Sequence, residues 1–169
     1  REEGLTLREA LRFQLNPEEL LGKEDGGTEV GVASGEWLAS VTRKLLDPML
    51  VKGLKPPASF RGELREYQKQ GLSWLGFLDS LQLGACLADD MGLGKTVQVL
   101  AFLSGIQKRK GTSLLIIPAS LIANWQSEIE RFAPRLKFFV AHPEAHREKG
   151  LRPPGKKELG RLDLGITTY

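Results

Sequence analysis

The most informative run in this chain of 169 residues is Asp89-Asp90-Met91-Gly92-Leu93-Gly94-Lys95-Thr96. It follows a short apolar run, residues 84–88, that suits a buried strand, and it opens a helical pattern over residues 94–108. Glycines at a strand-to-helix turn let the backbone turn tightly and approach a ligand closely. The amides that open a helix, with the positive end of its dipole, attract anions. We therefore predict a phosphate-binding loop here.

The side chains of this loop are those that hold a nucleoside triphosphate and its metal ion. Lys95 would bring its ammonium to the β- and γ-phosphates, and the Thr96 hydroxyl would coordinate Mg²⁺. We predict ATP and Mg²⁺ as cofactors, Lys95 and Thr96 as catalytic residues and Thr96 as the metal ligand. Nucleotide contacts are expected from Asp90, Met91, Gly92, Leu93, Gly94, Lys95 and Thr96.

The spacing departs from the general phosphate-loop pattern G-x-x-x-x-G-K-[ST] at one place. Asp89 stands where the first glycine would fall. This departure argues against small GTPases, whose loops generally keep that glycine, and suits helicase-type loops. The alternative is a glycine-rich strand-to-helix turn with an incidental lysine.

Strand-like and helix-like segments alternate after Phe60. Helical patterns cover residues 67–82, 94–108 and 119–132, and strand-like runs cover residues 84–88, 113–117, 136–141 and 163–168. Strands that alternate with helices of about a dozen residues indicate βαβ units. We predict an α/β fold, with a parallel sheet flanked by helices.

The N-terminal part has a different pattern. Thr6 to Glu9 reads as a capping box for a short helix, and residues 36–46 form a second helix candidate that Asp47-Pro48 ends. Lys55-Pro56-Pro57 indicates a linker, because successive prolines favour extended backbone. We predict a mainly helical segment over residues 1–60, without an assigned role, and the start of the nucleotide-binding lobe over residues 61–169.

Composition narrows the function further. Hydrophobic residues make up 41% of the chain and charged residues 27%, which is an ordinary globular balance. No apolar stretch is long enough to span a membrane, and Cys86, the only cysteine, suits a reducing compartment. Residues 1–30 carry a net charge of −4, and residues 135–161 one of +5. A basic end of this kind either meets a polyanion or is a solvated loop.

Four blocks in this order resemble the first motor lobe of a Swi/Snf-family ATPase of helicase superfamily two. Residues 64–75 resemble its adenine-recognition block, residues 87–96 its nucleotide loop, residues 115–128 its next, DNA-facing motif, and residues 163–169 the strand end that follows. The resemblance covers residues 63–169 and leaves residues 1–62 largely outside. It implies the first part of a RecA-like lobe and an ATP hydrolase that depends on double-stranded DNA and translocates along it.

The resemblance also implies roles for single residues. Gln68 becomes the adenine reader, because one carboxamide can donate to N7 and accept from the N6 amino group. Tyr67 either flanks the purine or packs in the core, and we favour packing. The residues expected to approach the DNA backbone are Ser120, Asn124, Thr167 and Thr168. Ser120 could instead cap its helix, and Trp125 is expected in the core.

Some parts of such a motor are not present in the sequence. No Asp-Glu-x-His block follows Thr96, and no second lobe with an arginine finger follows the first. We therefore expect a piece of a longer protein that does not turn over ATP by itself. Double-stranded DNA, and protein bound to it, are the expected partners, with a cytoplasmic, nucleoid-associated or nuclear location and no membrane. The alternatives are an RNA helicase of the same superfamily or a nucleotide-binding scaffold that never hydrolyses ATP.

Overall fold

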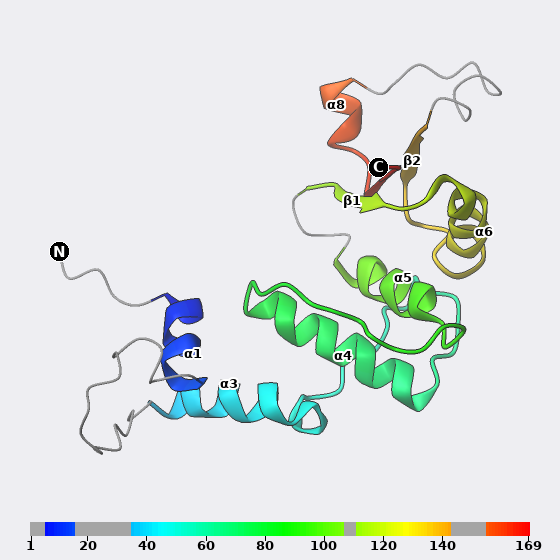
Figure 1. Cartoon of the computed structure of the whole chain (residues 1–169). Helices are drawn as coiled ribbons and strands as arrows, with labels where there is room; N and C mark the ends of the chain where they lie inside the picture. The colour runs from blue at the N-terminus through cyan, green and yellow to red at the C-terminus, as the bar shows by residue number, and fades with distance from the viewer. Residues whose placement is uncertain (1–5, 16–34, 107–110, 143–154) are drawn as a thin grey trace. The chain divides into compact units, whose positions relative to one another are not determined.

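The computed structural model describes residues 6–15, 35–106, 111–142 and 155–169, with the side chains of residues 13–15 and 156 excepted. Two compact units divide the chain after Val51, and each is described by itself. The described elements, in chain order, are α1 (Leu7–Leu15), α3 (Glu36–Leu46), the 3₁₀ helix η1 (Pro48–Leu50), α4 (Glu66–Ser80), α5 (Lys95–Ile106), β1 (Ser113–Ile116), the 3₁₀ helix η2 (Ala119–Leu121), α6 (Ile122–Phe132), β2 (Phe138–Ala141), α8 (Lys156–Leu159) and β3 (Leu164–Thr167) (Figure 1).

The first unit is helical, as its sequence predicts. The Thr6 backbone amide and hydroxyl donate to a carboxylate oxygen of Glu9 at 2.8 and 2.7 Å, and the Glu9 amide donates back to the Thr6 hydroxyl at 3.3 Å. This is the predicted capping box at the start of α1. Helix α3 ends at Asp47, whose carboxylate accepts the Met49 amide at 3.0 Å and so begins η1.

The second unit contains a three-stranded parallel sheet in the order β1-β3-β2. Ser113 and Phe138 both pair with Leu164, and Ile116 and Ala141 both pair with Thr167. The chain passes from β1 to β2 and then from β2 to β3 through two crossover connections. Parallel strands require such connections to be long. All three strands run in the same direction, so the sheet has one edge of strand starts and one edge of strand ends.

Helices α5 and α6 cover the core of this unit, and α4 packs against α5 (Figure 1). One face of α5 is buried, with Leu100 and Ala101 at 0% exposure. Trp125 of α6 is buried, as expected, together with Ile122 and Ile129. Leu121 is 43% exposed and belongs to η2. The core cluster draws only on residues between Phe60 and Ile166.

The sequence predicts a domain boundary between residues 60 and 61, whereas the two compact units divide after Val51. Phe60 is already part of the core of the second unit and stacks on Phe132 with ring centroids 6.2 Å apart. The Arg61 amide donates to the Phe132 carbonyl at 2.6 Å. The division into a helical segment over residues 1–60, without an assigned role, and a lobe over residues 61–169 stays a prediction.

One predicted strand is wrong. Residues 84–88 are extended without ladder hydrogen bonds, and Ala85, Cys86 and Ala88 are exposed. A strand needs a neighbour for its amides and carbonyls, and the three described strands pair only with one another. The segment instead returns along α4, where Leu87 approaches Gly71, and leads into the glycine loop (Figure 1). Among the described helices none is long and apolar enough to cross a bilayer.

Candidate nucleotide-binding site

The predicted loop has the backbone that its glycines allow. Gly92 has a φ of +85° and Gly94 one of +77°, both in the left-handed region that L-residues with a side chain rarely adopt. Helix α5 begins directly afterwards, at Lys95. A Cβ on Gly94 would lie 2.6 Å from Gln68 Nε2, so the glycine also lets that side chain approach. The left-handed turns explain why glycine is required at both positions.

The Lys95 ammonium is held by carbonyl groups of its own loop. Its Nζ donates to the Asp90 carbonyl at 2.9 Å and to the Asp89 carbonyl. These acceptors are neutral, and hydrogen bonds to an ionised acceptor are roughly twice as strong. Phosphate oxygens of a bound ligand can therefore replace the two carbonyls as hydrogen-bond acceptors of the Lys95 ammonium. The arrangement fits an anionic ligand, as the sequence predicts.

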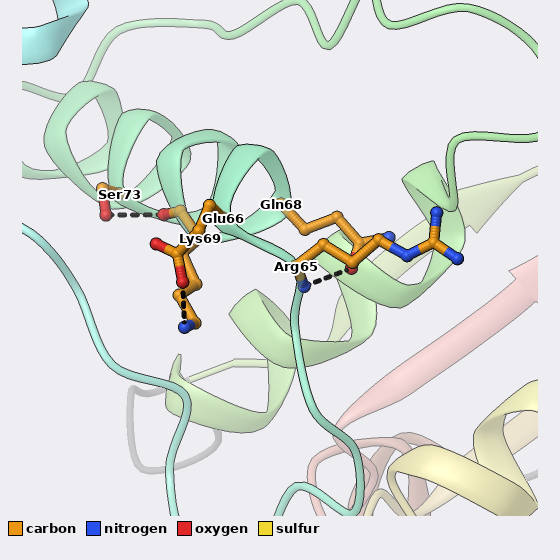
Figure 2. Close-up of polar contacts among 5 residues, drawn as sticks. All are labelled: Arg65, Glu66, Gln68, Lys69 and Ser73. Atoms are coloured by element: carbon orange, nitrogen blue, oxygen red, sulfur yellow. Dashed lines mark hydrogen bonds and ion pairs between the residues drawn. The ribbon is translucent and has the colours of Figure 1, made fainter.

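Gln68 connects helix α4 to the loop. It is 8% exposed, and its Oε1 accepts the Arg65 amide at 2.9 Å at the start of the helix (Figure 2). Its Nε2 donates to the Leu93 carbonyl at 3.0 Å. These bonds use one of two N–H groups and one of two lone pairs of the carboxamide. An N–H and a lone pair thus remain for the adenine contact that was predicted for this residue.

Tyr67 and Gln98 take part in the site in ways that the sequence did not suggest. The Tyr67 hydroxyl donates to the Leu93 carbonyl at 3.1 Å, so it contacts the loop; the residue is half-buried and is not part of the core cluster. Gln98 Nε2 donates to a carboxylate oxygen of Asp89 at 2.7 Å. Both bonds join residues far apart in the chain, and a tyrosine and a glutamine on helices carry no signal for such partners.

Thr96 fits a hard metal ion. It is the second residue of α5, half-buried and adjacent to Lys95. Oxygen ligands suit Mg²⁺, which usually takes one or two from the protein and the rest from phosphates and water. The described residues contain no group of three or more His, Cys, Asp or Glu side chains that could hold a metal ion on their own. The other residues predicted for nucleotide contact include Met91, which is 96% exposed.

The four residues expected near DNA lie by the same edge of the sheet or on the helix that leaves it. The Ile117 amide donates to the Thr167 carbonyl at 2.9 Å, so the ends of β1 and β3 lie side by side. Ser120, in η2, follows the end of β1, and Thr168 follows the end of β3. Asn124 is exposed in the first turn of α6, and its Nδ2 donates to Glu128 at 3.3 Å. The Thr167 hydroxyl donates its only proton to the Ala141 carbonyl at 3.3 Å. Ser120 is exposed and does not cap α6, since its N-cap is Leu121 without a side-chain bond.

Comparison with known proteins matches residues 67–169 to the family model of the SNF2-related domain. The chain belongs to this family. The match confirms the resemblance seen in the sequence and begins at Tyr67, within α4.

Relatives and solved structures agree with this SNF2-related assignment. The chain is 39% identical over 147 residues to YwqA of Bacillus subtilis, covering 78% of this chain and 16% of that protein. It is 39% identical over 158 residues to Helicase SWR1 of Kluyveromyces lactis, covering 90% of this chain and 10% of that protein. The Sulfolobus solfataricus SWI2/SNF2 ATPase core, solved in complex with dsDNA, is 39% identical with a TM-score of 0.59, covering 70% of this chain and 24% of that one.

These similarities confirm the predicted fold class. The structural neighbours are SNF2 ATPase cores, and the described sheet of this SNF2-related chain is parallel with helices packed around it. The chain spans less than a quarter of the length of each of these three proteins.

Proposed function

We propose that this chain is the ATP-binding part of a DNA-dependent ATPase that translocates along double-stranded DNA. The observation that carries the proposal is the Lys95 ammonium, held by the Asp90 and Asp89 carbonyls at the start of α5 between two left-handed glycines and the helix. Phosphate groups bind where a cation, the N-terminus of a helix and an open backbone turn come together. The SNF2-related family assignment supports ATP as the nucleotide.

Each residue of the site has a part in binding. Lys95 balances the negative charge of the phosphates, and this charge balance matters most when the charge moves during phosphoryl transfer. Gln68 has the remaining N–H and lone pair to contact adenine beside the loop that it already holds. Thr96 supplies an oxygen ligand to Mg²⁺, which neutralises charge on the phosphates when bound.

DNA is proposed as the second ligand, at the edge of the sheet where the strands end. Ser120 and Asn124 are exposed near that edge, and both carry groups that can donate to phosphate oxygens. The Asn124 carboxamide has a second N–H beyond the one directed at Glu128. The solved SWI2/SNF2 ATPase core in complex with dsDNA supports duplex DNA as the nucleic acid. Protein bound to that DNA is proposed as the target of the movement.

Equilibrium binding of a fluorescent ATP analogue with Mg²⁺ tests the nucleotide part. Lys95→Ala removes a cation that would bond charged oxygens, and hydrogen bonds to charged groups contribute about 1.5–3 kcal/mol. We expect affinity to fall by at least about tenfold, since about 1.4 kcal/mol corresponds to that factor. Lys52→Ala, which removes an exposed lysine away from the loop, is the matched control. Equal affinities of the Lys95→Ala variant and the wild type would reject the phosphate site.

A further inference from the structure

Gln98 is the most deeply buried polar side chain near the loop. It lies on α5 at 0% exposure, with Nε2 bonded to Asp89 and with no hydrogen-bond partner at Oε1. Helix α4 makes room for its carboxamide at Gly71, where an added Cβ would lie 1.9 Å from Gln98 Oε1. Burying an amide with one end unpaired is unfavourable. A side chain kept in this state at the base of a ligand loop points to a role beyond packing.

Asp89 joins Gln98 to the lysine that binds phosphate. The Asp89 carboxylate accepts from Gln98, and the carbonyl of the same residue accepts from Lys95 Nζ. Fixing the Asp89 side chain therefore fixes the carbonyl against which the Lys95 ammonium rests. The Asp89 carboxylate would weaken phosphate binding by charge repulsion, because it is a negative charge in a loop that binds a negative ligand.

We propose that Gln98 is a positioning residue for the phosphate loop. By bonding the Asp89 carboxylate it turns that charge toward the buried side of α5, away from incoming phosphates, and holds the loop so that Lys95 stays in place. This proposal rests on the proposed ATP site and explains how an aspartate can stand in it. Gln98 does not itself touch the nucleotide.

An exchange of donor and acceptor tests the bond itself. Gln98→Glu sets two carboxylates face to face, so ATP-analogue affinity of the full chain should fall by about tenfold or more, as expected when two like charges share one site. Asp89→Asn keeps an acceptor for Gln98 without the charge and should bind at least as well as wild type. The double variant Asp89→Asn/Gln98→Glu exchanges amide and carboxylate, and it should recover affinity to within about threefold of wild type. A double variant that melts like wild type but binds as poorly as Gln98→Glu would overturn the proposal.

A second variant separates positioning from stability. Gln98→Met fills the same space and removes the unpaired Oε1. The Asp89 carboxylate that loses its donor is only half-buried, so water can replace the lost hydrogen bond and the free energy of unfolding should change little. Its melting temperature should match that of wild type, while ATP-analogue affinity falls because the Asp89 carboxylate loses its donor. Gln70→Glu, the same chemical change as Gln98→Glu at an exposed position of α4, is the control and should bind like wild type.

The failure of this proposal can be told from the failure of the ATP site. If Lys95→Ala lowers affinity but Gln98→Met and Gln98→Glu bind like wild type, the positioning role is wrong and the ATP site stands. If Gln98→Met loses melting temperature and affinity together, the residue is only structural. If Lys95→Ala binds like wild type, the ATP site itself is rejected, and the role of Gln98 with it.

Discussion

Gln68 uses both ends of its carboxamide within the protein, once at Arg65 and once at Leu93. Its side chain thus has two functions to separate, one in holding the loop and one in recognising the base. Tyr67 shares the first function only, since its hydroxyl bonds the same Leu93 carbonyl. A comparison of the two residues can therefore isolate the second function.

At this scale we predict that Gln68→Ala narrows the preference for ATP over GTP. A paired contact to one base edge contributes about 1–3 kcal/mol of discrimination, and guanine cannot reproduce the adenine pattern. Competition of ATP and GTP against a fluorescent ATP analogue measures the ratio of their affinities. Tyr67→Phe is the matched control, because it loosens Leu93 without touching the carboxamide. It should weaken both nucleotides equally, and a ratio that changes as much as in Gln68→Ala would remove Gln68 from base recognition.

The helices differ in how their ends are stabilised. Helix α1 begins with a full capping box, whereas α6 begins without a side-chain cap at Leu121 and follows directly on a 3₁₀ turn. A capped short helix depends on the ionisation of its acid, because the carboxylate accepts the hydrogen bonds. The start of α1 is therefore sensitive to pH.

At the level of this element we predict that acid loosens the start of α1. Hydrogen bonds from the Thr6 hydroxyl and backbone amide lower the pKa of the Glu9 carboxyl below its usual range. Because the pKa of Glu9 is lower in the folded chain than in the unfolded chain, the hydrogen bonds stabilise the helix fully at a pH above the unfolded pKa. This contribution is lost as the pH falls through the pKa of Glu9 in the folded chain. An NMR titration of the Glu9 carboxyl measures it, and Thr6→Ala should raise the pKa. An unchanged titration in Thr6→Ala would refute the capping box.

In the second unit, the two edges of the sheet, where the strands end and where they begin, carry different residues. Ser120 and Thr168 follow strand ends, while Lys137 precedes β2 and its amide donates to an Asp163 carboxylate oxygen at 2.8 Å. Lys137, a basic residue of the stretch over residues 135–161, therefore lies at the edge where the strands begin, opposite Ser120 and Thr168. Arg147 and Lys149 follow β2 in the sequence and lie outside the described residues.

At the scale of the molecule we predict weak DNA binding without sequence preference that falls steeply with salt. Contacts to phosphates carry no base information, and each neutralised phosphate adds about 0.9 to the slope of log affinity against log salt. A salt titration of duplex binding measures this slope. Arg147→Ala with Lys149→Ala, which removes two charges of the basic stretch, should lower the slope. Lys137→Ala, at the edge where the strands begin, should leave the slope unchanged. Binding that does not respond to salt would refute backbone contact.

Much of this chain could be predicted from local patterns. The glycine loop, the helix α5 that follows it, the ends of α3 and the capping box of α1 all agree with the structure. These features depend on residues a few positions apart: a turn needs a left-handed residue, a cap needs an oxygen near free amides, and an apolar face needs a period of 3.6. The chemistry of phosphate binding is readable for the same reason, because its residues are consecutive.

Tertiary structure alone decided the features that join distant residues. Residues 84–88 have the composition of a strand, but a strand needs a neighbour to pair with, and this segment pairs with none of the described strands and instead approaches α4 at Gly71. The same holds for Tyr67 at Leu93, for Gln98 at Asp89 beside Gly71, and for Lys137 at the edge opposite Ser120. A side chain's own sequence neighbourhood does not name its partner across a fold, because the partner is set by how helices and strands pack.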